Sequence, residues 1–449
     1  MKKLNVLIIL LCAVGFCYGQ SAAWDGTTKT QVTPNGLKYV ITTPAQLAWI
    51  ADACATDEAA REFEGKEVII NADLDLGNKE WKPIGSPEHP FRGHFIGNNH
   101  NIKNLKITQS SMECVGLFGY IQGQSGVHAK IDSIYVTSST ITGGNNVGVL
   151  CGSALNTEFV HCGIKTATVN GVSKVGGLIG AMKNSTVYIS YTKGMTINVS
   201  NEWGGLFVGY NDSTFQSTFK ISNCYAKGKV TCANHGGGFV GYNGNKGNIE
   251  HCYCIIQFAG KVADCKNLGL FCAVNESNAK LNNCVYNSNI NGNMTDSAVF
   301  ENKNDISEQV DVWSSTKDGM TALNFFTNFT SDQGARGKWK QDFNLQAGTG
   351  FSINEGHPIL LWEYLANVSV KEAKEVQVSV YPNPVRNTLY IKSMGNEIKE
   401  IVIMDLLGKS MPQPNETEAI DMSQFKPGIY LIRITTKQGS TVTHKIVKQ

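Results

Sequence analysis

One cluster of metal-binding residue types is the run His251-Cys252-Tyr253-Cys254. Thiolate and imidazole groups are preferred zinc ligands, and a structural zinc site needs four of them around one ion. The surrounding residues predict a β-strand, in which neighbouring side chains point to opposite faces. Cys252 and Cys254 would then face one way and His251 the other. The run therefore predicts a strand with two buried cysteines and no metal site.

Two aspartates, Asp73 and Asp75, could begin a calcium site because they would share one strand face. No further acidic residues follow at the spacing of a calcium-binding loop. Carboxylates that accept hydrogen bonds from the backbone of a turn explain both residues. We expect neither a metal nor any other cofactor.

An enzyme that cleaves polysaccharides needs a pair of carboxyl groups, or a base beside Arg or Lys, on one exposed face. The outward strand positions carry mainly Tyr, Asn, Ser and Thr. Asp132 and Glu250 fall in one column, but unlike residues separate them. We therefore predict a protein that is not an enzyme. Side chains that converge from loops leave a polysaccharide lyase or glycoside hydrolase as an open alternative.

Tyrosine is the residue type that favours ligand binding in this chain. One set recurs at one position of successive repeats and predicts an outward stripe, and a second pair predicts a smaller stripe at a corner. These residues are Tyr135, Tyr191, Tyr225 and Tyr253, and then Tyr210 and Tyr242. Aromatic rings stack on sugars and anchor protein partners. The alternative is that tyrosine simply stabilises neighbouring strands.

A short phrase positions these residues by returning six times between Val115 and Ala273: VGLFG, VGVLCG, VGGLIG, GGLFVG, GGFVG and LGLFCA. The copies are separated by 33, 28, 29, 32 and 32 residues. A period near thirty with turn residues between apolar phrases predicts a stacked solenoid of about six rungs. The predicted core column is Leu117, Leu150, Leu178, Phe207, Phe239 and Phe271.

A second strand in each repeat carries small or apolar residues in register, at Ile134, Cys162, Ser190, Cys224, Cys252 and Cys284. Side chains in such a column stack about 4.8 Å apart in a narrow interior. Eleven of the 13 cysteines remain if Cys12 and Cys17 leave with a signal peptide. We interpret most of them as small buried hydrophobic residues, since stacking alone does not give disulfide geometry.

The repeated phrases resemble the GLUG repeats of bacterial surface proteins, some adhesins among them. The resemblance implies a parallel β-helix located outside the cell, and no particular reaction. We therefore expect an all-β protein whose main part is a parallel, right-handed β-helix. The net charge of +2 shows no long single-sign run, which disfavours nucleic acid and anionic membranes as partners.

The chain divides into segments of different character. Residues 1–19 predict a signal peptide; a lipoprotein signal is disfavoured because Phe16 precedes Cys17. No later segment is long and apolar enough to span a membrane. We expect an N-terminal cap with the first strands at 20–110, including a helix from Pro44 with Thr43 as its N-cap. The repeat β-helix follows at 111–299, then a C-terminal cap at 300–366 and a linker at 367–375.

Residues 376–449 resemble the C-terminal sorting domain of the type IX secretion system of Bacteroidota. The matching residues are Tyr381, Pro382, Asn383, Pro384, Asp405, Gly408, Lys409, Pro427, Gly428, Tyr430 and Lys445. The resemblance implies a small Ig-like β-sandwich that routes the chain through the periplasm and across the outer membrane, with the secretion machinery as partner.

Together these features predict an exported protein, outside the cell or on the outer-membrane surface, that binds its target. We expect an adhesin or binding module for a glycan or a host or matrix protein. The alternatives are the polysaccharide-degrading enzyme and a structural surface-layer or matrix component.

Overall fold

The computed structural model describes most of the N-terminal three-fifths of the chain and much of its C-terminal part. The described residues are 22–55, 63–124, 126–214, 219–257, 267–287, 299–302, 310–315, 338–340, 359–360, 378–393, 398–405, 419–436 and 441–449. The chain forms two compact units, Met1–Tyr364 and Leu365–Gln449. The predicted signal peptide and the predicted linker at 367–375 lie outside the described residues.

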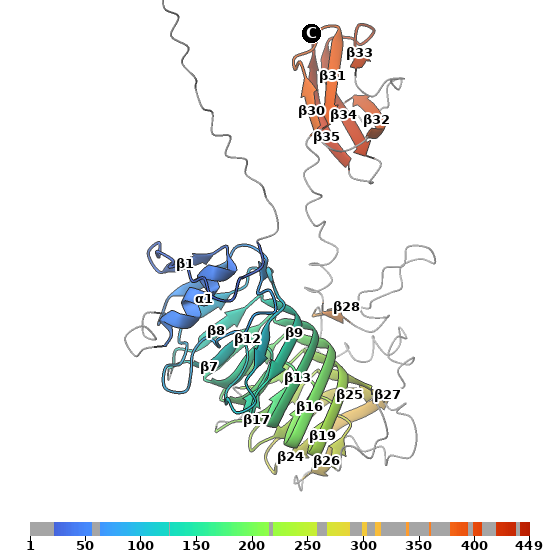
Figure 1. Ribbon diagram of the computed structural model, residues 1–449. Helices are drawn as coiled ribbons and strands as arrows, with labels where there is room; N and C mark the ends of the chain where they lie inside the picture. Colours follow the sequence, from blue (N-terminus) through green and yellow to red (C-terminus); the bar gives the residue numbers. More distant parts are fainter. Residues whose placement is uncertain are drawn as a thin grey trace, which may run out of the picture. The chain divides into compact units, whose positions relative to one another are not determined.

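The first unit is a parallel β-solenoid (Figure 1). Each complete turn carries three strands, such as β12, β13 and β14. The larger, twenty-stranded sheet contains β1 (Lys38–Ile41), β2 (Glu67–Ile70), β3 (Leu74–Asp75), β4 (His94–Ile96), β5 (Asn101–Lys103), β6 (Lys106–Thr108), β8 (Ala129–Asp132), β9 (Tyr135–Thr142), β10 (Asn145–Val147), β12 (Thr157–Val160), β13 (Gly163–Gly176), β15 (Thr186–Tyr188), β16 (Tyr191–Gly205), β18 (Ile221–Ser222), β19 (Tyr225–Gly237), β21 (Asn248–Glu250), β22 (Tyr253–Gln257), β23 (Leu268–Gly269), β25 (Lys280–Asn287) and β27 (Val310–Ser315).

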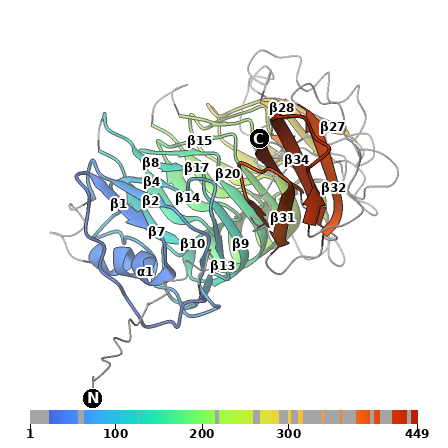
Figure 2. The ribbon, with the colours of Figure 1, turned by 90° about the horizontal axis from the view of Figure 1, so that it is seen from above.

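The remaining face is a seven-stranded parallel sheet built from the repeated phrase. Its strands are β7 (Phe118–Gln122), β11 (Cys151–Leu155), β14 (Ile179–Lys183), β17 (Val208–Asp212), β20 (Val240–Asn243), β24 (Cys272–Asn275) and β26 (Val299–Asn302). Seen from above, the colours run from blue to yellow along the stack, so each rung lies beside its neighbours in sequence (Figure 2).

The solenoid has about eight turns, which corrects the prediction of about six. The sequence prediction missed an N-terminal turn because this turn lacks the glycine phrase. In it, Ile84 and Phe91 form isolated parallel bridges to Phe118 and Ile121. At the other end, β26 and β27 continue the parallel pairing into the segment expected to be a cap.

The helix α1 (Pro44–Ala53) lies beside β1 at the first rung (Figure 1). Thr43 Oγ1 accepts a hydrogen bond from the Gln46 N–H at 3.3 Å, and the Gln46 side chain accepts one from the Thr43 N–H at 3.1 Å. This capping box satisfies N–H groups that the first helical turn leaves free. The helix buries Leu47 and Ile50, so the predicted N-cap and helix are confirmed.

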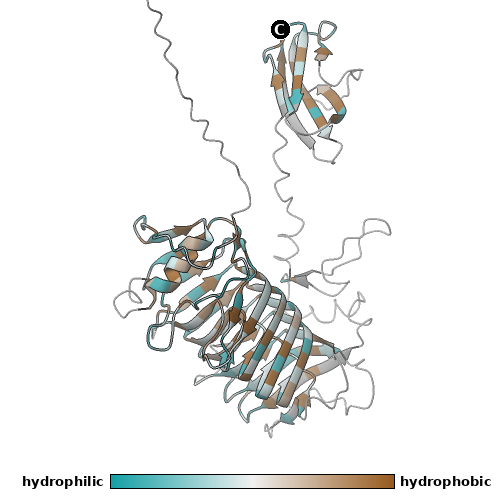
Figure 3. Ribbon diagram, in the orientation of Figure 1, coloured by the Kyte–Doolittle hydropathy of each residue, from teal (hydrophilic) through white to brown (hydrophobic). Residues whose placement is uncertain are grey.

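The interior columns form as predicted, and hydrophobic residues recur at matching positions of neighbouring strands (Figure 3). The core column from Leu117 to Phe271 is fully buried. Phe207, Phe239 and Phe271 stack face to face, with ring centroids 4.7 and 5.0 Å apart. The residue that ends each repeated phrase must be small because another segment of backbone lies close to it. A Cβ added at Gly180 would lie 2.4 Å from the backbone nitrogen of Val147.

The second column, with Cys162, Cys224, Cys252 and Cys284, is also completely buried. The ten cysteines that the structure describes are free thiols. Cys162 Sγ donates to the carbonyl oxygen of Val160 at 3.4 Å, and its neighbours in the column bond in the same way. Burial raises the pKa of the Cys162 and Cys252 thiols. They act as small core residues, as predicted.

A left-handed residue turns the chain just before each member of the cysteine column. The backbone φ is positive at Ser133, His161, Ile189, Asn223, His251 and Asn283. One such residue makes a sharp corner without a long loop, although it costs free energy for a bulky side chain. The corner therefore keeps every rung in the same register.

The second unit is a β-sandwich of two three-stranded antiparallel sheets. One sheet holds β30 (Val378–Tyr381), β31 (Thr388–Ser393) and β33 (Ala419–Asp421), and the other holds β32 (Ile398–Asp405), β34 (Gly428–Thr436) and β35 (Thr441–Lys448). Leu389, Ile420, Ile403 and Ile432 from the two sheets share one core, as the prediction of a small sandwich requires.

Three buried asparagines form a ladder inside the solenoid. Asn211 Nδ2 donates to Asn243 Oδ1, and Asn243 Nδ2 donates to Asn275 Oδ1, both at 2.8 Å. All three are nearly or fully buried at the ends of β17, β20 and β24. Their spacing of 32 residues equals the local repeat length, so each asparagine pairs with its counterpart on the next rung.

We expect Asn243→Leu to lower the free energy of unfolding of the solenoid by about 2–4 kcal/mol, because the buried amides of Asn211 and Asn275 each lose a partner. Urea titration followed by circular dichroism measures this change. The control Asn245→Leu alters an exposed asparagine and should stay within about 0.5 kcal/mol of the wild type. Equal effects of the two substitutions would contradict a role for the buried ladder.

Candidate functional site

The first tyrosine column lies on the outer side of the sheet but is not exposed. Tyr135, Tyr191, Tyr225 and Tyr253 are absent from the solenoid's core cluster, yet they are only 8, 0, 0 and 0% exposed. Tyr225 stacks on Tyr191 at 5.2 Å and on Tyr253 at 5.1 Å. The prediction of an exposed stripe is therefore wrong, because an outward direction in the pleat does not guarantee contact with water.

Gly163 explains how Tyr135 and Tyr191 pack at the N-terminal end of this column. Gly163 pairs with Tyr135 on one side and with Tyr191 on the other. A Cβ added there would lie 2.7 Å from Cζ of Tyr191. The Tyr191 ring therefore lies over the space that a side chain would fill, 6.5 Å from the Tyr135 ring. Lys165 and Lys193 each lie over the Tyr191 ring, at 5.9 and 5.2 Å.

A segment later in the chain covers Tyr225 and Tyr253, at the C-terminal end of the column. Two short antiparallel strands, β28 (Trp339–Lys340) and β29 (Ile359–Leu360), lie in the region that the sequence assigned to the C-terminal cap. The Trp339 ring lies 6.3 Å from Tyr225 and 5.5 Å from Tyr253. Its Nε1 donates to Asn223 Oδ1 at 3.0 Å. Trp339 thus closes the part of the stripe that was expected to bind a ligand.

The second tyrosine pair remains accessible. Tyr210 and Tyr242 are paired in β17 and β20, and both are partly exposed. Their rings stack at 4.5 Å with an interplanar angle of 3°. Trp203 contacts both, with centroid distances of 5.4 and 5.6 Å. We call Trp203, Tyr210 and Tyr242 the aromatic corner.

Charged groups hold the aromatic corner in place. Lys174 Nζ lies 4.5 Å above the Tyr210 ring and 5.6 Å from the Trp203 ring, which are cation–π distances. The Tyr242 hydroxyl donates to Glu276 Oε1 at 2.9 Å. Burial, followed by this hydrogen bond, raises the pKa of the Tyr242 hydroxyl. Burial also raises the pKa of Tyr210. The corner therefore presents neutral phenols between one cation and one carboxylate.

The sequence prediction missed Trp203 and Lys174. Both lie at a second corner of the solenoid, where each rung again has one left-handed residue: Cys114, Asn146, Lys174, Trp203 and His235. Each stands two residues before a glycine of the repeated phrase or its flank. Alignment on those glycines would have placed Lys174 and Trp203 in one column. The resulting cluster depends on side-chain directions that a one-column alignment does not give.

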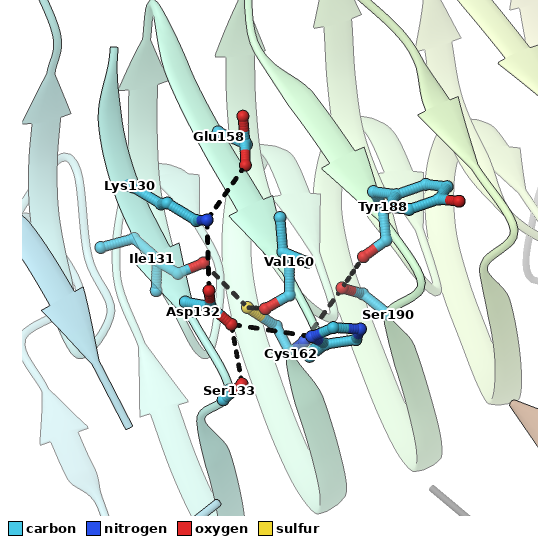
Figure 4. A network of polar contacts seen from close by, with 10 residues as sticks. Lys130, Ile131, Asp132, Ser133, Glu158, Val160, Cys162, Tyr188 and Ser190 are labelled. Carbon is cyan, nitrogen blue, oxygen red and sulfur yellow. Dashed lines mark hydrogen bonds and ion pairs between the residues drawn. The ribbon is translucent and has the colours of Figure 1, made fainter. Parts of the chain in front are cut away.

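A network of charged residues occupies another face, on β8 and β12 (Figure 4). Lys130 Nζ lies 3.2 Å from Asp132 Oδ2 and 3.5 Å from Glu158 Oε1. His161 Nδ1 lies 3.7 Å from Asp132 Oδ1, and Ser133 Oγ donates to Asp132 at 2.7 Å. The His161 side chain, then Ser133 and Lys130, hold the pKa of Asp132 at about 2 despite partial burial. Asp132 is therefore ionised at neutral pH and cannot serve as a general acid.

The candidate metal-binding residues are placed as follows. Asp75 Oδ1 accepts from the Gly77 N–H at 2.9 Å, as expected for a carboxylate at a turn. Asp73 Oδ1 instead accepts from the N–H of Asn101 in β5, on the next rung, at 3.0 Å. Cys252 and Cys254 are buried. Within the part of the chain that the structure describes, no three His, Cys, Asp or Glu side chains converge as metal ligands would.

Residues from both ends of the sorting-domain motif meet at β35. Asn383 Oδ1 accepts from the Val447 N–H at 2.9 Å, and Gly428 pairs with Lys448. Tyr381, Pro382, Asn383, Pro384, Pro427 and Gly428 are exposed. The buried Tyr430 donates from its hydroxyl to the Lys426 carbonyl at 3.0 Å. Asp405 ends β32 and Lys445 pairs with Leu431. Gly408 and Lys409 lie outside the described residues.

The fold thus defines a class of two-unit protein, a parallel β-solenoid followed by a small antiparallel sandwich. Residues 379–449 match the family of secretion system C-terminal sorting domains. The chain therefore carries the sorting tail of the type IX secretion system, which exports proteins to the cell surface or beyond. None of the described helices is both long and apolar enough to cross a membrane.

Two relatives match about a third of the chain. A halomucin of Haloquadratum walsbyi is 30% identical over 146 residues, which cover 30% of this chain and 2% of the relative. A putative Gly-rich membrane protein of Evansella cellulosilytica is 29% identical over 154 residues, or 32% of this chain and 17% of the relative. The match thus spans a small part of both relatives. No solved structure shows a significant match.

We expect Trp339→Ala to destabilise the solenoid by about 3–5 kcal/mol, as large-to-small changes of a buried aromatic residue do. Trp339→Phe keeps the ring contacts with Tyr225 and Tyr253 but removes the hydrogen bond to Asn223, so its cost should be about 1 kcal/mol. Thermal unfolding with tyrosine accessibility as a second signal measures both. An unchanged melting temperature in Trp339→Ala would show that the cover is not part of the stable fold.

We expect the stabilising effect of Asp132 to depend on pH. Its folded pKa of about 2 lies below the ordinary 3.8, so the unfolded chain binds this proton more strongly. The contribution is present above about pH 4 and is lost as the pH falls toward 2. Asp132→Asn should therefore lower the melting temperature at neutral pH, and the two curves should converge in acid. A difference that persists at about pH 2 would contradict this assignment, and His161→Gln should reduce the difference at neutral pH.

Proposed function

We propose that this chain is an exported surface protein of the adhesin type, which binds a glycan or a protein through the aromatic corner. The observation that carries the proposal is the accessible Trp203, Tyr210 and Tyr242 cluster on a rigid stack of strands. The resemblance of the repeats to GLUG repeats and of the tail to Bacteroidota sorting domains supports the same location. The sorting unit delivers the solenoid, and the solenoid makes the contact.

The chemistry of the corner suits recognition. Trp and Tyr are the residues that most often dominate the free energy of binding at interfaces, because they combine a large apolar face with a polar tip. Trp203 already contacts Tyr210, Tyr242 and Lys174, so its side chain would lose little conformational entropy when a ligand binds. Glu276 and Lys174 supply polar groups at the edge of the apolar surface.

The charged network on β8 and β12 motivates an enzyme as the second candidate function. Asp132, Glu158, Lys130 and His161 include the residue types that polysaccharide cleavage uses. Binding is favoured because Asp132 and Lys130 are paired with each other, and a general acid with a pKa of about 2 would be deprotonated at working pH. A structural matrix component is the third candidate, and it predicts self-association that is insensitive to changes at the corner.

The test is the binding of purified full-length chain to arrays of glycans and extracellular-matrix proteins. We expect Trp203→Ala combined with Tyr242→Ala to raise the dissociation constant for the bound ligand by about thirtyfold or more, the effect of losing an interface hot spot. The matched control Tyr188→Ala changes a partly exposed tyrosine of β15, on another face, and should bind as the wild type does.

Three outcomes would count against the proposal. Equal loss of binding in the control would point to misfolding, which a circular dichroism spectrum checks. Release of new oligosaccharide ends from an arrayed glycan would favour the enzyme. Wild-type protein that binds no array component but forms ordered assemblies would favour the structural component.

A further inference from the structure

Besides the aromatic corner, the solenoid carries an open groove of about 360 Å³ on the outer side of β9, β13, β16 and β19. One wall is a column of polar side chains that pair from rung to rung, Thr142, Asn170, Asn198 and Thr231. The groove follows the bend where register shifts occur after Gly171 and after Val199. It therefore runs along the stack, across the strands.

The polar wall is ordered by its own hydrogen bonds. Asn198 Nδ2 donates to Asn170 Oδ1 at 2.8 Å, and Asn170 Nδ2 donates to Thr142 Oγ1 at 3.1 Å. Each amide nitrogen carries a second N–H, and each hydroxyl can both donate and accept. All four side chains are partly exposed. The wall therefore offers a periodic set of fixed donors and acceptors to a ligand in the groove.

The other residues that line the groove are apolar or carry a small hydroxyl group. Gly143, Gly171 and Val199 line the groove, Val172 is 39% exposed, and Ser110 and Ser200 complete the lining. Among these described lining residues none carries a charge. Binding an acidic polysaccharide or a nucleic acid requires cationic groups, so the lining favours a neutral ligand. The apolar lining residues and the column of amides and hydroxyls together match a sugar ring, which has both C–H faces and hydroxyl groups.

The distance between successive residues of the polar column further restricts the class of ligand. Neighbouring rungs lie about 4.8 Å apart, which is close to the length of one hexose in an extended β-linked chain. Four successive rungs could therefore each meet one sugar unit. A globular protein partner would have no reason to match this repeat.

We propose that the groove binds an extended, neutral, β-linked polysaccharide that runs along the solenoid axis. The proposal goes beyond the proposed function, because it names a ligand class for a second site: the column of Thr142, Asn170, Asn198 and Thr231, which is separate from the aromatic corner. Asn198 and Trp203 both belong to β16, but the corner's Tyr210 and Tyr242 belong to β17 and β20 of the other sheet. The contributions of the two sites can be separated by substitution.

The test is isothermal titration of full-length chain with the hexasaccharides of cellulose, β-mannan and xylan, and with an oligogalacturonate as the acidic probe. We expect at least one neutral oligosaccharide to bind and the acidic one to bind at least tenfold more weakly. Asn170→Ala with Asn198→Ala should raise the dissociation constant about tenfold or more, since the wall loses its two amides.

The matched control is Asn245→Ala with Asn278→Ala, which removes another pair of exposed asparagines bonded between rungs, at 3.0 Å. It should leave binding unchanged. The corner variant of Trp203 and Tyr242 should also keep its affinity for the neutral oligosaccharide.

Three results would overturn the groove proposal: no neutral oligosaccharide binds, the acidic probe binds as well, or the wall variant and the control behave alike. Loss of oligosaccharide binding in the corner variant alone would refute the groove while supporting the proposed function. Loss in the wall variant alone, with no ligand found for the corner, would support the groove proposal and refute the proposed function of the aromatic corner.

Discussion

The structure depends on one constraint, the in-register stacking of parallel strands at a spacing of about 4.8 Å. In the strands, backbone groups bond to the rungs before and after, so the side chains of paired residues lie above one another. In a narrow interior this favours columns of similar residues, such as Phe207, Phe239 and Phe271. It also allows a polar column where amides can bond along the stack, as Asn211, Asn243 and Asn275 do. A slip in register would break both columns at once.

The same in-register stacking also forms columns of side chains on the outer side of the sheets. These columns differ in how much of them is exposed to solvent. The tyrosines from Tyr135 to Tyr253 stack as an outer column but are buried, and Trp339 packs over two of them. The aromatic corner stays accessible, and so does the groove wall with Asn170 and Asn198. Regular repetition thus builds several possible ligand surfaces, and the irregular segments decide which of them meet water. This division suits a scaffold whose recognition can change without changes to its core.

The sorting tail and the candidate binding surfaces belong to separate units of the chain. The sandwich carries the sorting tail, in which Asn383 and Val447 join the two ends of the motif. The solenoid holds the columns and the candidate binding surfaces. Its described cysteines are free and buried, so its stability rests on packing and hydrogen bonds and not on cross-links.

The sequence by itself determined the repeats, the inward columns, the capped helix at Pro44 and the sorting tail, because each follows from local patterns of residue type and spacing. It undercounted the rungs, since the turn through Ile84 and Phe91 lacks the glycine phrase. Only the tertiary structure decided which outward residues are exposed. Trp339 lies far along the chain from Tyr225, and Trp203 meets Tyr210 through the geometry of a corner. Periodicity fixes the direction of a side chain, but solvent exposure depends on every segment that packs over it.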